Sequence, residues 1–210
     1  MPGAGDNRVP LPRRPTSWQT FLNAHWGGIA GADFFTTDVW TWQGLVTYYT
    51  VFVIDLASRR VQILGSTPHP NDLFMAQMVR RVTAADDGVL VGHRVLICDR
   101  DQKWSRAVRR RFSGAGIQVV LTPERAPNAN AYAERFVRSI KDECLYRIIP
   151  IGERHFHRAV TEFVEHYHRE RNHQGLRNEL IAGATMNDTA GCVRRHPRLG
   201  GLLSFYERAA

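Results

Sequence analysis

The stretch DFFTTDVWTWQGLVTYYTVFVIDLASRRVQILG, residues 33–65, decides the fold expected for this chain. Its β-branched and aromatic residues form three runs, which are interrupted at Trp42-Gln43-Gly44 and again at Ala57-Ser58-Arg59. Runs of this kind, separated by turn-forming residues, are typical of antiparallel strands joined by hairpins. The middle run, residues 45–56, is apolar on nearly both faces and is therefore expected in the middle of a covered sheet.

The chain after this stretch alternates between helix and strand patterns. We expect a helix over 71–81, a short buried strand that ends at Asp99, a helix over 102–112 and a strand over 116–121. A strand, a helix and a further strand in succession form a parallel crossover. The sequence therefore predicts an α/β fold, in which a mixed sheet is covered by helices.

The segment NANAYAERFVRSIKDECL, residues 128–145, has the clearest helical periodicity of the chain. One stripe is apolar and contains Ala133, Phe136, Val137, Ile140 and Cys144. A second stripe contains Glu134, Arg138 and Lys141, because a helix turns by about 100° per residue and Lys141 returns to within roughly 20° of Glu134. A further helix is expected over 153–171, with Phe156, Val160, Phe163 and Tyr167 buried.

Composition narrows the class of protein. The chain has 210 residues and a formal net charge of +8, and a chain this basic most often meets phosphate-rich polymers. Ribosomal, chromatin and DNA-processing roles are all open on this ground. The chain has no apolar run as long as the roughly 20 residues of a membrane span and no secretory signal pattern, so a cytoplasmic protein is expected. The three cysteines are far apart and favour neither a disulfide frame nor a zinc ribbon, and are expected to be core thiols.

The strand that ends at Asp99 raises a question of function. Acids at strand ends usually cap turns, but ligands of open α/β sheets gather beyond the carboxyl ends of parallel strands. If an acid of the first strand and Glu134 of the later helix reach the same edge, three carboxylates meet there. Such a cluster is costly unless cations neutralise it, and two Mg²⁺ ions would do so.

These motifs resemble those of a known family. DFFTTD, ICDRD and NANAYAERF, with Lys141 seven residues after Glu134 and 34 residues between Asp99 and Glu134, look like the integrase catalytic core of DDE transposases and retroviral-type integrases. The resemblance covers about residues 32–180. It implies an RNase H-like fold with a mixed five-stranded sheet, three antiparallel strands followed by parallel crossovers, flanked by helices.

The same resemblance implies a bacterial insertion-sequence transposase that cleaves and joins DNA with two Mg²⁺ ions, for which Mn²⁺ can substitute. Asp33, Asp99 and Glu134 would be the catalytic and metal-binding residues, and Lys141, Arg138 and Asn130 would contact DNA. The partners would be transposon ends and target DNA, bound by a homo-oligomer. A metal-dependent nuclease of the same fold is one alternative, since hydrolysis needs only the first half of that chemistry. An inactive DNA-binding remnant is the other, since we expect that the helix-turn-helix segment usual in the family does not precede this core.

The first acid is ambiguous, because Asp33 and Asp38 lie on the same expected strand and, five residues apart, point to opposite faces. We prefer Asp33. A hairpin folded near Gln43 places Asp33 opposite about Val53, close to the end of the second strand, whereas Asp38 lies near the turn. The string DFFT also resembles the first-acid segment of the family more closely.

Structural roles are expected for several other polar or aromatic residues. Asp55 is expected to cap a turn, and Asp101 to cap the helix that follows it. Asn128 and Asn130 could cap the next helix or contact the DNA backbone. We expect solvated positions on a DNA-facing helix for His155, His157, His166, His168 and His173. The arginines at 109–111, 194, 195 and 198 are expected on solvated faces or in contact with phosphates. Trp40 and Trp42 are expected to be packing residues.

The domain organisation expected from these patterns has three parts. Residues 1–28 would form a basic arm and a short helix, residues 29–182 the integrase catalytic core, and residues 183–210 a C-terminal basic tail.

Overall fold

The computed structural model describes residues 26–84, 88–123, 130–183 and 192–209, together with Thr20 and Leu22. The basic arm and most of the short helix expected before residue 28 lie outside these ranges, as does Asn128.

The first three strands form the antiparallel part of the sheet. A 3₁₀ turn, η1 (Trp26–Gly28), leads into β1 (Ile29–Thr41), which pairs with β2 (Gly44–Asp55), and β2 pairs in turn with β3 (Val61–Thr67). The two interruptions between the apolar runs of the sequence are therefore the turns that connect these strands. Asp33 lies opposite Phe52 and not Val53, because the first turn is a two-residue loop.

Two parallel crossovers extend this sheet from β1. The helix α2 (Asp72–Val82) precedes β4 (Val95–Cys98), and α3 (Arg106–Gly114) precedes β5 (Gln118–Leu121). β4 is parallel to both β1 and β5, so the strand order is β3-β2-β1-β4-β5. The mixed five-stranded sheet expected from the sequence is confirmed.

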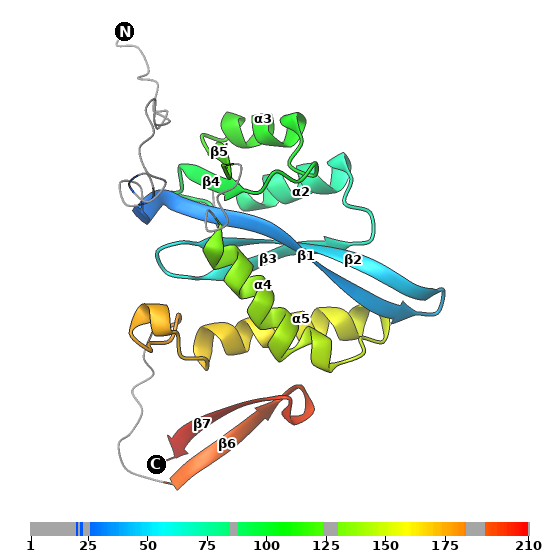
Figure 1. Ribbon diagram of the computed structural model, residues 1–210, viewed down its shortest axis with the longest axis vertical. Helices are drawn as coiled ribbons and strands as arrows, with labels where there is room; N and C mark the ends of the chain where they lie inside the picture. The colour runs from blue at the N-terminus through cyan, green and yellow to red at the C-terminus, as the bar shows by residue number, and fades with distance from the viewer. Residues whose placement is uncertain are drawn as a thin grey trace.

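Two further helices cover the other face of the sheet. These are α4 (Ala131–Glu143) and α5 (Gly152–Arg169), with the 3₁₀ turn η2 (Leu145–Arg147) between them and η3 (Gln174–Leu176) after α5. Figure 1 shows α2 and α3 on one side of the sheet and α4 and α5 on the other.

Each face of the sheet has its own apolar core. Residues such as Ile29, Phe35 and Ile97 pack with α4 and α5, whereas Ala32, Val53 and Cys98 pack with α2 and α3. All four residues expected to be buried on α5 are buried, namely Phe156, Val160, Phe163 and Tyr167. Of the predicted stripe on and after α4, Ala133, Phe136, Ile140 and Cys144 are buried, whereas Val137 is only partly buried.

The expected C-terminal basic tail contains a β-hairpin instead. β6 (Cys192–Arg198) and β7 (Leu203–Ala209), joined by η4 (Leu199–Gly201), pair with each other beside α5 (Figure 1). Arg198 anchors the hairpin to α5, because its Nε donates to Glu170 Oε1 at 2.8 Å and its Nη1 donates to Glu165 Oε2 at 3.2 Å. Leu203 joins the core beneath α5.

The start of α3 differs from its expected position. The helix begins at Arg106, and its N-cap is Ser105, whose hydroxyl accepts from the Val108 amide. Asp101 is not a helix cap. It accepts from the Lys103 amide at 2.8 Å and forms an ion pair with the Lys103 ammonium, so it stabilises the turn before the helix.

Two expectations about packing are also wrong. Trp40 and Trp42 are exposed, Trp42 with 92% of its surface accessible, because the β1–β2 hairpin extends beyond the helices that cover the sheet. Cys192 is exposed on the hairpin edge, whereas Cys98 and Cys144 are buried thiols as expected. Among the helices of the described residues, none is both long and apolar enough to cross a membrane.

The packing of α4 yields the first prediction. Ile140 lies on the core-facing side of α4, and its side chain is fully buried. Ile140→Ala should therefore lower the free energy of unfolding by about 2 to 5 kcal/mol through the cavity it leaves. Urea denaturation measures this, with Arg138→Ala on the exposed face of the same helix as the control, expected to change stability by about 0.5 kcal/mol or less. Equal stability of the two variants would contradict the packing of α4.

Candidate functional site

The pairing of β1 with β4 places two of the predicted acids side by side. The parallel register runs from Ile29 opposite Val95 to Ala32 opposite Cys98, so Asp33 and Asp99 are the next residues of the two strands. Alternate residues of a strand point to opposite faces. Because Ile29 and Val95 face α4 and α5, Asp33 and Asp99 lie on that same side.

The start of α4 brings Glu134 to this edge. Asn130, the residue before the helix, donates from Nδ2 to the backbone carbonyl of Ala32 at 3.2 Å, one residue before Asp33. This contact requires Gly31, since a β-carbon there would lie 2.8 Å from the Asn130 side-chain oxygen. The helix therefore begins directly over β1, and Glu134 lies in its first turn.

The charges of Asp99 and Glu134 both act on the carboxyl group of Asp33. The pKa of Asp33 is raised to about 6, first by burial and then by the charges of Asp99, Glu134 and Asp101, against a hydrogen bond from the Phe34 amide that lowers it. A buried carboxylate whose neighbours are carboxylates is short of positive charge. The site is thus suited to cations.

The donors at this edge fit a divalent oxygen-binding ion such as Mg²⁺, which prefers carboxylates. Across the described ranges, however, no three His, Cys, Asp or Glu side chains are close enough together to hold a metal ion as they stand.

The other two acids of the antiparallel strands have structural partners. Asp38 is exposed, lies opposite Thr47 near the hairpin turn and accepts from the Thr47 hydroxyl at 2.6 Å. Its side chain also points to the sheet face opposite to that of Asp33. Asp55 accepts from the Ser58 amide and contacts His93 at 2.7 Å, which confirms the expected turn role.

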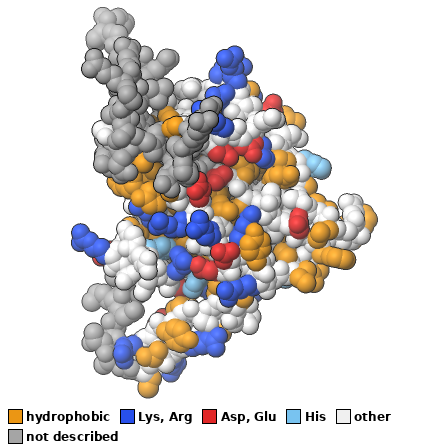
Figure 2. Space-filling view, viewed as in Figure 1, with side chains coloured by type: hydrophobic (Ala, Val, Ile, Leu, Met, Phe, Trp, Pro, Cys, Tyr) orange, Lys and Arg blue, Asp and Glu red, His pale blue; other side chains and the backbone are white. Residues whose placement is uncertain are grey.

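A basic stripe continues along α4 from the acids. Arg138 is exposed, and the Lys141 ammonium lies 5.9 Å from the centre of the exposed Tyr146 ring. Asn130 differs from these two residues, because only 7% of its surface is accessible and its amide faces β1. Figure 2 shows acidic side chains gathered on one face of the molecule, with Lys and Arg side chains directly below them.

The histidines do not form the solvated row that the sequence suggested. His155 and His157 are exposed, but His166 and His173 are buried. His166 pairs with Glu170 at 2.9 Å, and His173 donates from Nε2 to the Tyr167 carbonyl at 2.7 Å. These side chains hold the end of α5 and the segment after it in place.

The sequence analysis did not single out Gly31, and it assigned Asn130 a role in helix capping or DNA contact. Gly31 permits the close approach of Asn130, and Asn130 ties α4 to β1 instead of capping the helix with its side chain. A glycine inside a strand pattern is the available sequence signal, because it often marks a close approach of another chain segment.

The raised pKa of Asp33 gives the second prediction. An unfolded aspartate has the ordinary pKa of 3.8, so the folded chain binds this proton more tightly, and stability falls as the pH rises from about 4 to about 6. We therefore expect Asp33→Asn to be more stable than the wild type at pH 7, by on the order of 1 to 3 kcal/mol, and about equal to it at pH 4.

Urea denaturation in a chelating buffer at both pH values tests this expectation. Asp38→Asn is the matched control, because it removes an acid of the same strand that lies on the exposed hairpin. A stability gap for Asp33→Asn that does not widen between pH 4 and pH 7 would show that burial and the neighbouring acids do not raise the pKa of Asp33.

Comparisons with known proteins show a sequence likeness for part of the chain and a likeness in fold for most of it. Residues 115–179 match the sequence model of the family described as Integrase core domain. No curated protein matches the chain in sequence.

Solved structures resemble the fold more widely. A chain of the simian T-cell lymphotropic virus intasome in complex with the PP2A regulatory subunit B56 gamma matches with a TM-score of 0.53 and 11% identity, over 87% of this chain and 67% of that one. The catalytic core domain of BIV integrase matches with a TM-score of 0.49 and 12% identity, over 71% of this chain and 88% of that one. The described chain thus has the RNase H-like fold of an integrase core, and residues 115–179, which include Glu134 and Lys141, carry the sequence likeness to that family.

Proposed function

We propose that this protein is a DNA transposase of the bacterial insertion-sequence type, which cleaves DNA and transfers strands with divalent cations. The observation that carries this proposal is the meeting of Asp33 and Asp99 on adjacent parallel strands with Glu134 on the helix anchored above them. The basic charge of the chain and the integrase-core likeness of residues 115–179 support it.

The proposed roles follow from where each side chain lies. Asp33, Asp99 and Glu134 would hold two Mg²⁺ ions, for which Mn²⁺ can substitute. When bound, such ions activate a hydroxyl nucleophile and stabilise the charge that develops on phosphorus. Asn130 is a positioning residue, because its hydrogen bond to the Ala32 carbonyl holds the start of α4 over β1.

Lys141 and Arg138 would bind phosphates of the DNA backbone beside the acids. Both lie on the stripe of α4 that contains Glu134, so a strand held by these cations would pass the carboxylates. Two DNA ends and a target must be present for strand transfer, which favours a homo-oligomer on DNA.

Substitution of the acids tests the catalytic part of the proposal. Asp99→Asn and Glu134→Gln should stay folded but lose Mg²⁺-dependent DNA cleavage and strand transfer to background, because each change removes a metal ligand and nearly preserves shape. Cleavage of duplexes that carry the element ends is measured with Mg²⁺ and with Mn²⁺, and Asp38→Asn is the control that should retain activity.

Two outcomes would revise the proposal. Cleavage at the wild-type rate by either acid variant would remove the triad assignment. Cleavage without any joining of a 3′-hydroxyl end to target DNA would instead identify a metal-dependent nuclease, since hydrolysis needs water alone as the nucleophile.

The basic stripe gives a separate binding prediction. Lys141→Ala should weaken DNA binding and reduce the slope of log affinity against log salt concentration by about one unit, as expected for one lost phosphate contact. Fluorescence anisotropy over a series of salt concentrations measures the slope. Lys141→Arg, which keeps the charge, should leave the slope unchanged, and an unchanged slope in the alanine variant would exclude this contact.

A further inference from the structure

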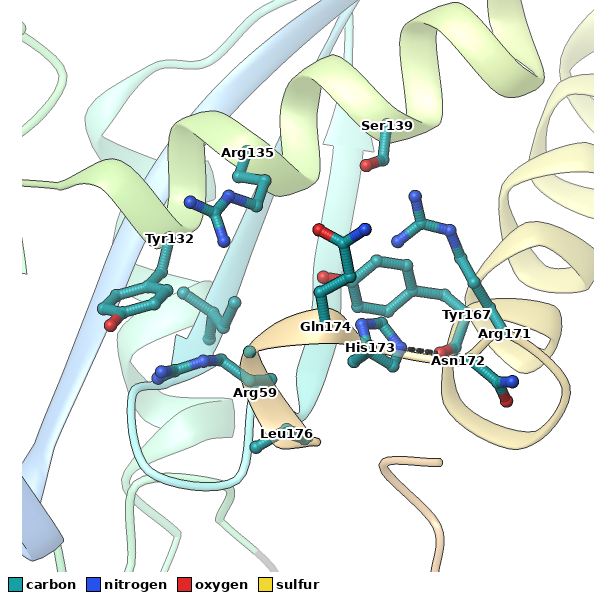
Figure 3. A pocket seen from close by; sticks show the side chains of 12 residues that line it. Arg59, Tyr132, Arg135, Ser139, Tyr167, Arg171, Asn172, His173, Gln174 and Leu176 are labelled. Carbon is teal, nitrogen blue, oxygen red and sulfur yellow. Dashed lines mark hydrogen bonds between the residues drawn. The ribbon is translucent and has the colours of Figure 1, made fainter. Parts of the chain in front are cut away.

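A pocket with a strongly basic lining lies on a different flank of α4 from the acids. It has a volume of about 410 Å³, and its walls come from α4, from the turn after β2 and from the segment after α5. Figure 3 shows Arg59, Arg135 and Arg171 around it, with Gln174 between them. The lining includes neither aspartate nor glutamate.

The pocket and the carboxylates are separated by the geometry of one helix. Tyr132, Arg135 and Ser139 lie roughly 100° to 160° around α4 from Glu134, whereas Arg138 and Lys141 lie within about 40° of it. The pocket is therefore distinct from the basic stripe that accompanies the acids, although both lie on the same helix.

Two of the three arginines lack an acidic partner within the described part of the chain. Arg171 is neutralised, because its Nη2 contacts Glu143 Oε1 at 2.6 Å. Arg59 stacks on the Tyr132 ring at 3.5 Å, its buried Nη1 has no hydrogen-bond partner among the described residues, and burial lowers the pKa of its guanidinium. Arg135 is exposed at the pocket edge and forms no described ion pair.

Neutral side chains of the pocket lining add hydrogen-bond donors to the arginines. Ser139, Asn172 and Gln174 offer hydroxyl and amide hydrogens, and buried His173, which donates to the Tyr167 carbonyl, stiffens the segment that carries Gln174. Burial lowers the pKa of His173, which disfavours its charged form. Guanidinium groups with a nearby set of neutral donors suit the tetrahedral oxygens of phosphate.

We propose that this pocket binds a phosphate group of a nucleic-acid backbone, held by Arg59 and Arg135 together. The assignment rests on the proposed function for the identity of the polymer, but the anion chemistry comes from the pocket itself. Its volume exceeds that of a bare ion and is in the range of pockets that take small organic ligands, so it admits a phosphate with its adjoining sugar.

A double-mutant cycle tests whether the two arginines clamp one phosphate. Arg135→Gln and Arg59→Gln should each reduce the salt slope of DNA binding by about one unit, and the double variant should show the same reduction, because all three lose the same contact. Arg154→Gln on the exposed surface of α5 is the matched control for a lost charge. Circular dichroism establishes that each variant is folded.

Two results would overturn the proposal. An Arg135→Gln slope equal to that of the Arg154→Gln control would remove the site, and this variant alone decides the matter if Arg59→Gln does not fold. A double variant whose slope falls by the sum of the single changes would show two separate surface charges instead of a pocket.

Titration with inorganic phosphate separates the two sources of the anion. Millimolar phosphate should shift the backbone NMR signal of Gln174 in the wild type and not in Arg135→Gln, and a short DNA duplex should shift the same signal at lower concentration. Saturation by phosphate with no response to DNA would assign the pocket to the free ion and contradict the backbone assignment.

These binding measurements are made in a chelating buffer and do not depend on DNA cleavage, so they are independent of the catalytic proposal. A chain that binds DNA through the pocket but never cuts it would refute the transposase assignment alone. A chain that cuts DNA with an unchanged salt slope in the arginine variants would refute the pocket alone.

Discussion

The parallel pairing of β1 with β4 is the constraint on which the rest of the site depends. Because the register ends at Ala32 opposite Cys98, the next residues of both strands are acids that point to the same face. A shift of one residue in this register would turn one acid toward α2 and α3, where the other core fills the space. The buried residues Ile29, Val95 and Ile97 fix that register by packing on one side.

The third acid depends on a contact between backbone and side chain. Gly31 leaves room for the Asn130 amide, which reaches the Ala32 carbonyl and holds the first turn of α4 over β1. Phe136 and Ile140 then anchor the helix in the core, which turns Glu134 outward beside Asp33. Core packing therefore supplies the free energy that keeps mutually repelling carboxylates at one edge.

The sequence predicted the elements whose patterns are strong and local. The three antiparallel strands, the stripe of α4 and the choice of faces for Asp33 and Asp38 followed from periodicity alone. The hairpin β6–β7 did not, because its anchor is an ion pair between Arg198 and Glu170, two residues whose proximity depends on tertiary packing. The exposure of Trp42 was missed for the same reason, since composition does not reveal how far a hairpin extends past its helices.

The basic pocket shows a further limit of linear patterns. Arg59, Arg135 and Gln174 are far apart in the chain, and Arg59 has a positive φ of 64° in the turn after β2, which no helical or strand periodicity describes. The pocket exists because that turn and the segment after α5 approach the same flank of α4. One helix thus divides the surface: its first flank carries the acids with Arg138 and Lys141, and its second carries cations that have no acids in their pocket. A polyanion that crossed α4 would meet positive charge on both flanks and the carboxylates at one defined place.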